Sequence, residues 1–327
     1  MLYAESPSTD PYFNLAMEQH LFDTAGKHED IFFLWQNDNA IIIGKNQNAE
    51  AEINKEFVAK NGIKVVRRLS GGGAVYHDLG NINFTFITGT KGTAEPDMQR
   101  FCEPVVALLR SMSANAYISG RNDILIGGKK ISGNAQYVKN NRCLHHGTIL
   151  FDSDLDIIEQ ALTPTDAKLK SKGVASIRSR IATVREHIGK CNIEEFKEKL
   201  KYAVLGARFT KYHLTAGDKV TIEKLKNEQY ATWKWNFGRS PRFSQHKKRR
   251  IEGCGNIEIY LEVQNGAIEA IEFFGDYFGS RDTTELTSML TGCRLEETAV
   301  REALVGIDIS HYFCRLGMSD FVEILCR

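Results

Sequence analysis

The sequence predicts an α+β protein with a mixed, largely antiparallel sheet, helices around it, and a small α+β C-terminal domain. Two observations carry this prediction. Strand patterns joined by tight turns outnumber strand–helix–strand units, which argues against a doubly wound parallel sheet. The chain has 327 residues, more than the roughly 250–300 that one hydrophobic core usually spans. We therefore expect a large domain at 1–243, a linker at 244–252 and a small domain at 253–327.

The first elements are a helix and a strand pair. Apolar residues recur at helical spacing over 12–24, and Asp10 and Pro11 suit the cap and the first turn. The apolar runs 31–36 and 40–45 are separated by three polar residues. This pattern predicts two strands paired through a tight turn.

The middle of the large domain alternates strands and helices. A helix over 49–60 is expected to stop at Asn61-Gly62, before strands at 63–68 and 81–88. A helix over 97–112 follows. Residues 122–136 then contain a Gly127-Gly128 hairpin turn. Further elements are expected as a strand at 145–152 and helices near 154–162, 192–208 and 219–236.

The C-terminal part begins after a basic, non-periodic run at 244–250, which we interpret as a solvated linker. Residues 256–277 alternate apolar and polar around Asn265-Gly266, the signal of a two-residue hairpin turn. Two helices are expected near 282–292 and 296–306.

Composition limits the class of protein. The net charge is +1, so no global field favours a nucleic-acid or membrane partner. The N-terminus lacks a basic start and an apolar core, and no apolar run approaches the roughly 20 residues of a membrane span. Seven scattered cysteines without a CxxC pair indicate reduced thiols, a cytoplasmic location and no structural zinc. A monomer is our default expectation.

The segment RRLSGGGAVYHDLGN (67–81) is the most informative stretch. Three consecutive glycines are costly to order, but they let backbone N–H groups approach an anion closely. Arg67 and Arg68 would add positive charge. The segment matches neither GxxxxGK[ST] nor GxGxxG, and from composition a phosphate site and a simple turn are equally supported.

A second polar cluster lies at 119–136. Asn122 and Asp123 begin one strand, and Lys129 and Lys130 follow the hairpin turn. Neighbouring strand residues point to opposite faces, so only one of these two lysines can point into a site. The stretch HHGTIL (145–150) adds two adjacent histidines, each of which is also a common structural residue.

Three of these stretches together resemble the lipoate–protein ligase family. They are RRLSGGGAVYHDLGN, GRNDILIGGKKISGNAQ and HHGTIL, and their order along the chain also agrees. DPYFNLAMEQ (10–19), KGVASIRSR (172–180) and WKWNFG (233–238) resemble the family's opening helix, its adenylate-covering loop and the end of its large domain. The wider superfamily also contains biotin ligases and octanoyltransferases.

The resemblance implies a two-step reaction. Lipoate attacks the α-phosphate of ATP, with Mg²⁺ as the ion of the nucleotide, and gives lipoyl-AMP and pyrophosphate. A lysine of an acceptor protein then attacks the adenylate and forms an amide. The implied acceptors are apo lipoyl domains of 2-oxoacid dehydrogenase acyltransferase subunits and the glycine-cleavage H protein. Octanoate is a further expected substrate, because an apolar pocket rejects small changes poorly.

The resemblance also assigns residues. Lys130 matches the family's site lysine, which would touch both the lipoyl carbonyl and the α-phosphate. A larger set is expected to bind ATP or lipoyl-AMP: Arg68, Gly73, Ala74, Val75, Tyr76, Asp123, Arg178 and Arg180. Lipoate is expected to contact Lys130, Gly72, His77 and His146, and Asp123 is the candidate Mg²⁺ ligand. Residues 170–182 would be mobile without ligand, and the C-terminal domain would act as a mobile lid.

Two other functions remain open. The first is an ATP-independent lipoyl or octanoyl transferase that uses a Cys143 thioester, which requires a lowered thiol pKa. The second is a non-catalytic protein that only binds lipoate. The presence of Lys130 argues against the second, and the C-terminal domain favours the ligase over the transferase.

Overall fold

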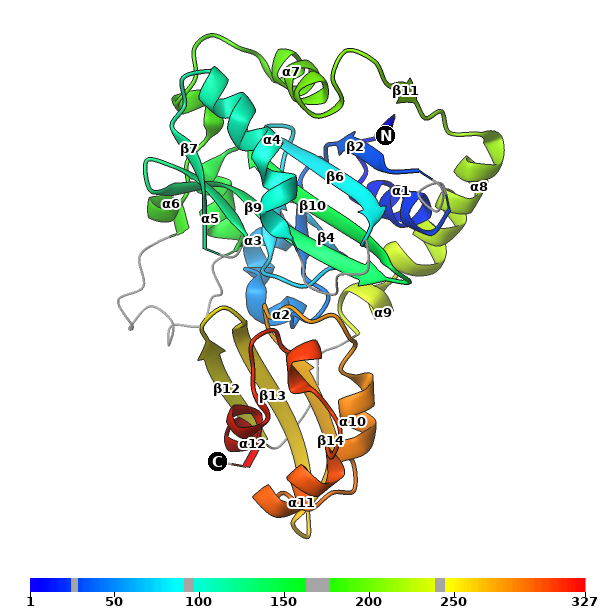
Figure 1. Cartoon of the computed structure of the whole chain (residues 1–327), viewed down its shortest axis with the longest axis vertical. Helices are drawn as coiled ribbons and strands as arrows, with labels where there is room; N and C mark the ends of the chain where they lie inside the picture. Colours follow the sequence, from blue (N-terminus) through cyan, green and yellow to red (C-terminus); the bar gives the residue numbers. More distant parts are fainter. Residues whose placement is uncertain (25–28, 91–96, 121, 163–176, 239–244, 327) are drawn as a thin grey trace.

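The computed structural model describes residues 1–24, 29–90, 97–120, 122–162, 177–238 and 245–326. A large body contains most of the sheet and helices, and a smaller one contains the C-terminal hairpin and its helices (Figure 1). The predicted α+β class is confirmed.

The large domain is built on an eight-stranded mixed sheet. In spatial order its strands are β11 (Thr210–Lys211), β1 (Leu2–Glu5), β2 (Ile31–Trp35), β6 (Asn81–Gly89), β10 (Arg142–Leu150), β9 (Lys129–Lys139), β8 (Asp123–Ile126) and β7 (Ala116–Ser119). β1 pairs in parallel with β2 and β11, whereas the pairs from β2 to β7 are antiparallel. The sheet is therefore largely antiparallel, as predicted.

Tight turns set the register of the strands that carry the site. Gly127 and Gly128 have φ values of 57° and 80° between β8 and β9. Asn140 and Asn141 have φ values of 52° and 58° between β9 and β10. Two consecutive positive φ angles are the geometry that suits the right-handed twist of a hairpin. These turns bring Lys130 and His146 onto neighbouring strands.

A second, three-stranded sheet covers one end of the site. Its order is β4 (Lys64–Arg67), β3 (Ala40–Ile43) and β5 (Val75–His77). The prediction that runs 31–36 and 40–45 pair with each other is wrong, because β2 belongs to the large sheet and β3 to this one. Both strands are buried along their whole length, and a continuous apolar run does not reveal its partners.

Helices cover the sheets of the large domain (Figure 1). They are α1 (Pro11–Asp23), α2 (Ala49–Glu52), α3 (Lys55–Lys60), α4 (Met98–Ser111), α5 (Leu155–Ala161), α6 (Ile177–Arg180), α7 (Ile193–Leu205), α8 (Ala216–Leu225) and α9 (Trp233–Asn236), with a 3₁₀ turn η3 (Val184–Glu186) and a π turn η4 (Lys226–Tyr230). The helix predicted over 49–60 is two helices, because the Asn54 side chain accepts the Phe57 N–H and caps a new start. The helix predicted over 219–236 is likewise divided into α8, η4 and α9.

The C-terminal domain contains a three-stranded antiparallel sheet, β12 (Gln245–Ile251), β13 (Gly255–Gln264) and β14 (Ala267–Phe274). Its helices are α10 (Thr284–Leu290), α11 (Glu297–Ala303), η5 (Ile309–His311) and α12 (Met318–Cys326). The hairpin predicted at Asn265-Gly266 is confirmed, and both residues have positive φ. The last helix, α12, was not predicted.

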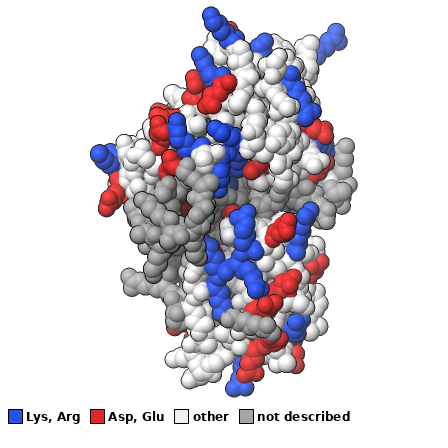
Figure 2. All heavy atoms as spheres, turned by 90° about the vertical axis from the view of Figure 1, so that its left-hand side faces the viewer, with Lys and Arg blue, Asp and Glu red and all other residues white. Residues whose placement is uncertain are grey.

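The segment expected as a linker, 244–252, needs correction. Gln245–Ile251 pair with β13 along their whole length, as the edge strand of this sheet. Charged side chains are common on edge strands, and here Lys248 pairs with Glu258 and Arg249 with Glu323. The face that carries β12 shows basic and acidic side chains interspersed (Figure 2). The exact domain limits stay a prediction.

The C-terminal domain contacts the large domain next to the glycine-rich segment. The Gly275 N–H donates to the Asn46 carbonyl at 2.8 Å, and Lys45 forms an ion pair with Asp282 at 2.7 Å. Within the described ranges, no helix combines the length and the apolar composition that crossing a membrane requires.

Candidate active site

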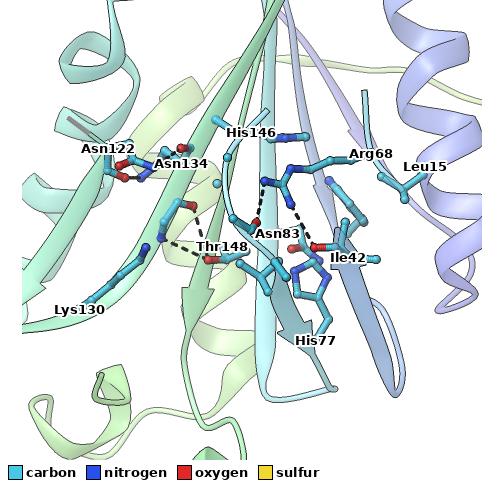
Figure 3. A pocket seen from close by; sticks show the side chains of 18 residues that line it. Leu15, Ile42, Arg68, His77, Asn83, Asn122, Lys130, Asn134, His146 and Thr148 are labelled. Carbon is cyan, nitrogen blue, oxygen red and sulfur yellow. Dashed lines mark hydrogen bonds between the residues drawn. The ribbon is translucent and has the colours of Figure 1, made fainter. Parts of the chain in front are cut away.

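One pocket collects most of the predicted site residues. It has an empty volume of about 580 Å³, its open mouth included, and lies where the large and small sheets of the first domain meet. Its lining consists of Leu15, Trp35, Ile42, Arg68, Gly72, Gly73, Ala74, Val75, His77, Asn83, Asn122, Lys130, Gly133, Asn134, Ala135, His146, Gly147 and Thr148. Lys130 lies at one side with Asn122 and Thr148, and the apolar Leu15 and Ile42 lie across from it (Figure 3). The side opposite Lys130 therefore combines apolar side chains with the buried Arg68 guanidinium.

Lys130 lies on one side of the pocket. Its Nζ lies 2.8 Å from Asp123 Oδ1, and both side chains are about one-third exposed. A methyl group at Gly133 would lie 2.8 Å from this Nζ, so the glycine makes room for the lysine side chain. Lys129 is exposed and is not part of the lining. This agrees with the expectation that only one of the two lysines points into the site.

The glycine-rich segment is a loop between β4 and β5, and its three glycines have different surroundings. A Cβ at Gly71 would lie 2.6 Å from the Tyr277 carbonyl oxygen of the C-terminal domain. Gly72 has a φ of 90°, which side chains disfavour. A Cβ at Gly73 would meet no described atom within 4 Å. The loop is thus closed by the C-terminal domain on one side and faces the pocket on the other.

Arg68 is buried and holds this loop. Its Nη2 donates to the carbonyls of Gly71 and Gly73 at 2.7 and 2.8 Å, and its Nη1 donates to the Ile42 carbonyl at 3.1 Å. Burial lowers the pKa of Arg68 to about 10. Arg67, expected to add charge, is buried outside the lining and donates to backbone carbonyls, including that of Gly44.

A buried hydrogen-bond chain links this arginine to helix α1. Arg68 Nε donates to Ser70 Oγ at 3.0 Å, and Ser70 Oγ lies 2.6 Å from His146 Nε2. His146 Nδ1 lies 2.9 Å from Glu18 Oε1, which also accepts from Thr85 Oγ1 at 2.7 Å. Glu18 is 1% exposed. His146 lines the pocket as predicted, but both of its ring nitrogens already have partners.

Sequence reasoning missed Glu18 and Gly133. Glu18 lies in α1 among buried, mostly apolar side chains, and a carboxylate next to such positions is itself a sign of a buried polar contact. Gly133 is a glycine inside a strand, which often marks a close approach.

Other predicted residues lie elsewhere. Tyr76 points away from the pocket into the core, with its hydroxyl donating to Asn39. Arg178 is half-exposed and pairs with Asp156, and neither it nor Arg180 lines the pocket. The expected adenylate-covering loop, 172–180, and the segment expected to be mobile, 170–182, lie outside the described residues as far as 176.

Cys143 and His145, two residues that could act as nucleophile or base, are both buried. Cys143 lies in the core next to β9, outside the pocket lining, and burial raises the pKa of its thiol to about 12. Burial also lowers the pKa of His145 well below its usual value. Among the described residues, no three His, Cys, Asp or Glu side chains gather as metal ligands would.

Comparison with known proteins gives consistent matches. Residues 10–205 match the lipoyl protein ligase A/B catalytic domain, and residues 240–325 match the bacterial lipoate protein ligase C-terminus. The chain is 41% identical to lipoate-protein ligase LplJ of Bacillus subtilis (strain 168) over 99% of this chain and 100% of that protein. It is 42% identical to lipoate–protein ligase 1 of Staphylococcus aureus (strain Mu50) over 97% of each chain.

Solved structures agree with this. The P. falciparum LipL1 complex with lipoate has the same fold, with a TM-score of 0.80 and 24% identity over 99% of this chain and 98% of that one. A lipoate-protein ligase A bound with ATP has a TM-score of 0.61 and 28% identity over 72% of this chain and 97% of that one. An archaeal bi-partite lipoate protein ligase, described with its E2 lipoyl domain, has a TM-score of 0.64 and 28% identity over 75% of this chain and 98% of that one.

Proposed function

The chain belongs to the lipoate–protein ligase family, and from this premise we propose how its pocket carries out the reaction. The protein is an ATP-dependent enzyme that attaches lipoate to protein. The observation that best supports a specific mechanism is the pocket itself, in which Lys130 lies across from the apolar Leu15 and Ile42, and the glycine loop contributes to the lining.

We propose that the lipoate carboxylate lies at Lys130 and the acyl chain extends toward Leu15 and Ile42. Attack of a carboxylate on the α-phosphate of ATP brings two anions together, which repel each other. The Lys130 ammonium offsets this repulsion, and it stabilises the charge that develops on the phosphate. The product of this step is lipoyl-AMP, which the acceptor lysine then attacks to form the amide.

The backbone of Gly72, Gly73, Ala74 and Val75 is proposed to bind the adenylate and the acyl chain. All four residues line the pocket. Arg68, expected to contact the nucleotide directly, already donates to two carbonyls of this loop. We therefore propose that Arg68 acts first as a positioning residue, which holds the loop in the shape that the adenylate needs. Tyr76 contributes through its backbone, because its side chain points into the core.

Mg²⁺ would enter with ATP as the ion of the nucleotide. Asp123 lies next to Lys130, and a single carboxylate together with phosphate oxygens and water is a usual Mg²⁺ environment. The residue therefore fits the proposed role, provided that Lys130 exchanges its contact with Asp123 for the bound phosphate. Arg178 and Arg180 would approach the adenylate only after Arg178 leaves Asp156.

The acceptor is proposed to be an apo lipoyl domain of a 2-oxoacid dehydrogenase acyltransferase subunit or the glycine-cleavage H protein. The archaeal relative described with an E2 lipoyl domain supports the first class. The protein is proposed to act as a monomer in the cytoplasm. The seven cysteines all lie in the described ranges and form no disulfide there, which is consistent with a reducing compartment.

A cysteine-dependent transferase is the alternative that the structure disfavours. Its nucleophile would be Cys143, but that thiol is buried outside the pocket and has a raised pKa. A thioester mechanism needs an accessible thiol with a lowered pKa.

Lipoate-dependent exchange between ATP and labelled pyrophosphate tests the proposal. The ligase mechanism requires exchange without any acceptor protein, because lipoyl-AMP formation is reversible. A transferase or a simple lipoate binder would show none. Exchange without lipoate would also contradict the mechanism, because no acyl adenylate could then form.

A further inference from the structure

His77 is a buried polar side chain to which the mechanism above gives no role. It lies on β5, is 2% exposed and lines the pocket. Its Nε2 has no hydrogen-bond partner among the described residues. In Figure 3 the ring lies across the pocket from Lys130. A buried donor or acceptor without a partner is costly, so this nitrogen points to a contact made by the pocket's occupant.

The surrounding amides determine which ring nitrogen of His77 carries the proton. Asn14 Nδ2 donates to the backbone carbonyls of Ser8 and Gln36, which fixes the orientation of that amide. The same amide donates to Asn37 Oδ1 at 2.9 Å, so Asn37 must present its Nδ2 to His77 Nδ1, which lies 3.0 Å away. His77 Nδ1 is therefore the acceptor, and the proton of the neutral ring is on Nε2.

The ring is also held neutral. Burial lowers the pKa of His77 to about 3, and electrostatic interaction with the nearby Arg68 and His146 side chains contributes to this shift. At neutral pH the side chain is thus a fixed donor of one N–H, not a cation. Its partner in the pocket must be a hydrogen-bond acceptor.

The position of the ring selects the part of the acyl group that it meets. His77 packs edge-on against Trp35, with ring centroids 6.3 Å apart, on the side opposite Lys130. With the carboxylate at Lys130, the far end of the acyl chain approaches this side. In lipoate that region carries the two sulfur atoms of the dithiolane ring, which are weak acceptors. In octanoate the same region is hydrocarbon and accepts nothing.

We propose that His77 Nε2–H donates a hydrogen bond to a dithiolane sulfur of lipoate, and that this contact makes the pocket favour lipoate over octanoate. The inference rests on the proposed function, since it assumes that the carboxylate lies at Lys130. Octanoate would leave the buried N–H unpaired, whereas lipoate satisfies it. A site with a buried polar group discriminates against an analogue that cannot pair with it.

The first test compares His77→Leu and His77→Gln by pyrophosphate exchange with lipoate and with octanoate. Leucine removes the donor, while the glutamine Nε2 can reproduce an N–H near the histidine Nε2. We expect His77→Leu to lower the lipoate-to-octanoate ratio of kcat/KM about 3- to 10-fold, as the loss of one neutral hydrogen bond does. His77→Gln should keep the ratio within about twofold. Equal losses for both substrates in His77→Leu would overturn the proposal.

A second test needs no variant. The unmodified protein, labelled with ¹⁵N-histidine, is titrated by NMR with lipoate and with octanoate. We expect a ring protonated at Nε2, and a displacement of its N–H proton signal by lipoate that is clearly larger than that by octanoate. Equal displacements, or a ring protonated at Nδ1, would overturn the contact. Absence of lipoate-dependent exchange in the unmodified protein would instead overturn the proposed function, and the titration would still decide about His77.

Discussion

The buried carboxylate of Glu18 should be essential for the stability of the large domain. Replacement by methionine, which is unbranched and of similar length, removes the acceptor but fills the space. Two donors then lose their partner, His146 Nδ1–H and Thr85 Oγ1–H. An unsatisfied buried donor costs about 1–3 kcal/mol, so two donors cost roughly 2–6 kcal/mol. The buried cation of Arg68 also loses its nearby negative charge.

Urea denaturation followed by tryptophan fluorescence measures this loss. The three tryptophans of the chain, Trp35, Trp233 and Trp235, all precede β12, so the signal reports the large domain. Glu50→Met is the matched control. Its carboxylate is half-exposed and pairs with Lys55, and exposed pairs contribute at most about 1 kcal/mol.

The chain of hydrogen bonds also makes a prediction about the double variant. Glu18→Met together with His146→Phe should lose less free energy of unfolding than the sum of the single variants, because the second change removes one of the orphaned donors. A loss below about 1 kcal/mol in Glu18→Met, or full additivity in the double variant, would refute the reasoning.

Five further substitutions test the site. Lys130→Ala should lower adenylate formation at least roughly 10²–10³-fold, as removal of an electrostatic donor does. Lys129→Ala should have little effect. Equal losses of pyrophosphate exchange in the two variants would contradict the assignment of Lys130 as the site lysine. Cys143→Ser should retain exchange and ligation, because its thiol is protonated at neutral pH; inactivity of the folded variant would favour the transferase. Gly71→Ala should weaken contact with the C-terminal domain and raise protease sensitivity at the interface, because its Cβ would overlap a Tyr277 backbone oxygen. Gly73→Val should instead weaken the binding of lipoate or ATP, measured by calorimetry. Unchanged affinity for both ligands would mean that the loop only connects strands.

Local signals in the sequence predicted elements better than their pairing. The hairpins at Gly127-Gly128 and Asn265-Gly266 were predictable, because two neighbouring residues encode each turn. The partner of β3 was not, because a fully buried run carries no information about its neighbours. β12 was missed as a strand for a different reason. Most of its residues are exposed, and its consecutive basic side chains obscured the alternation of a strand.

The site divides in the same way. Contiguous motifs located the glycine loop, Lys130 and His146, which the fold brings to one pocket. The role of Arg68 was not visible, because its donors are used by carbonyls that come within reach only when the loop closes. The protonated nitrogen of His77 depends on Asn14 and Asn37, and no spacing rule connects these residues. Hydrogen bonds between residues this far apart in the sequence form only after the chain has folded.

The unequal surroundings of the three loop glycines have an evolutionary consequence. We expect natural selection to act at Gly71 on the contact with the C-terminal domain, at Gly72 on the backbone φ angle, and at Gly73 on the space that the proposed substrate needs. A lineage that lost the C-terminal domain would therefore release Gly71 alone from constraint. A lineage that evolved toward a bulkier acyl group would keep Gly71 and Gly72 and would vary the residues that line the pocket. A saturation library of Gly71–Gly73 can be selected separately for docking of the C-terminal domain and for ligation activity. The two selections would distinguish the constraints on the three glycines.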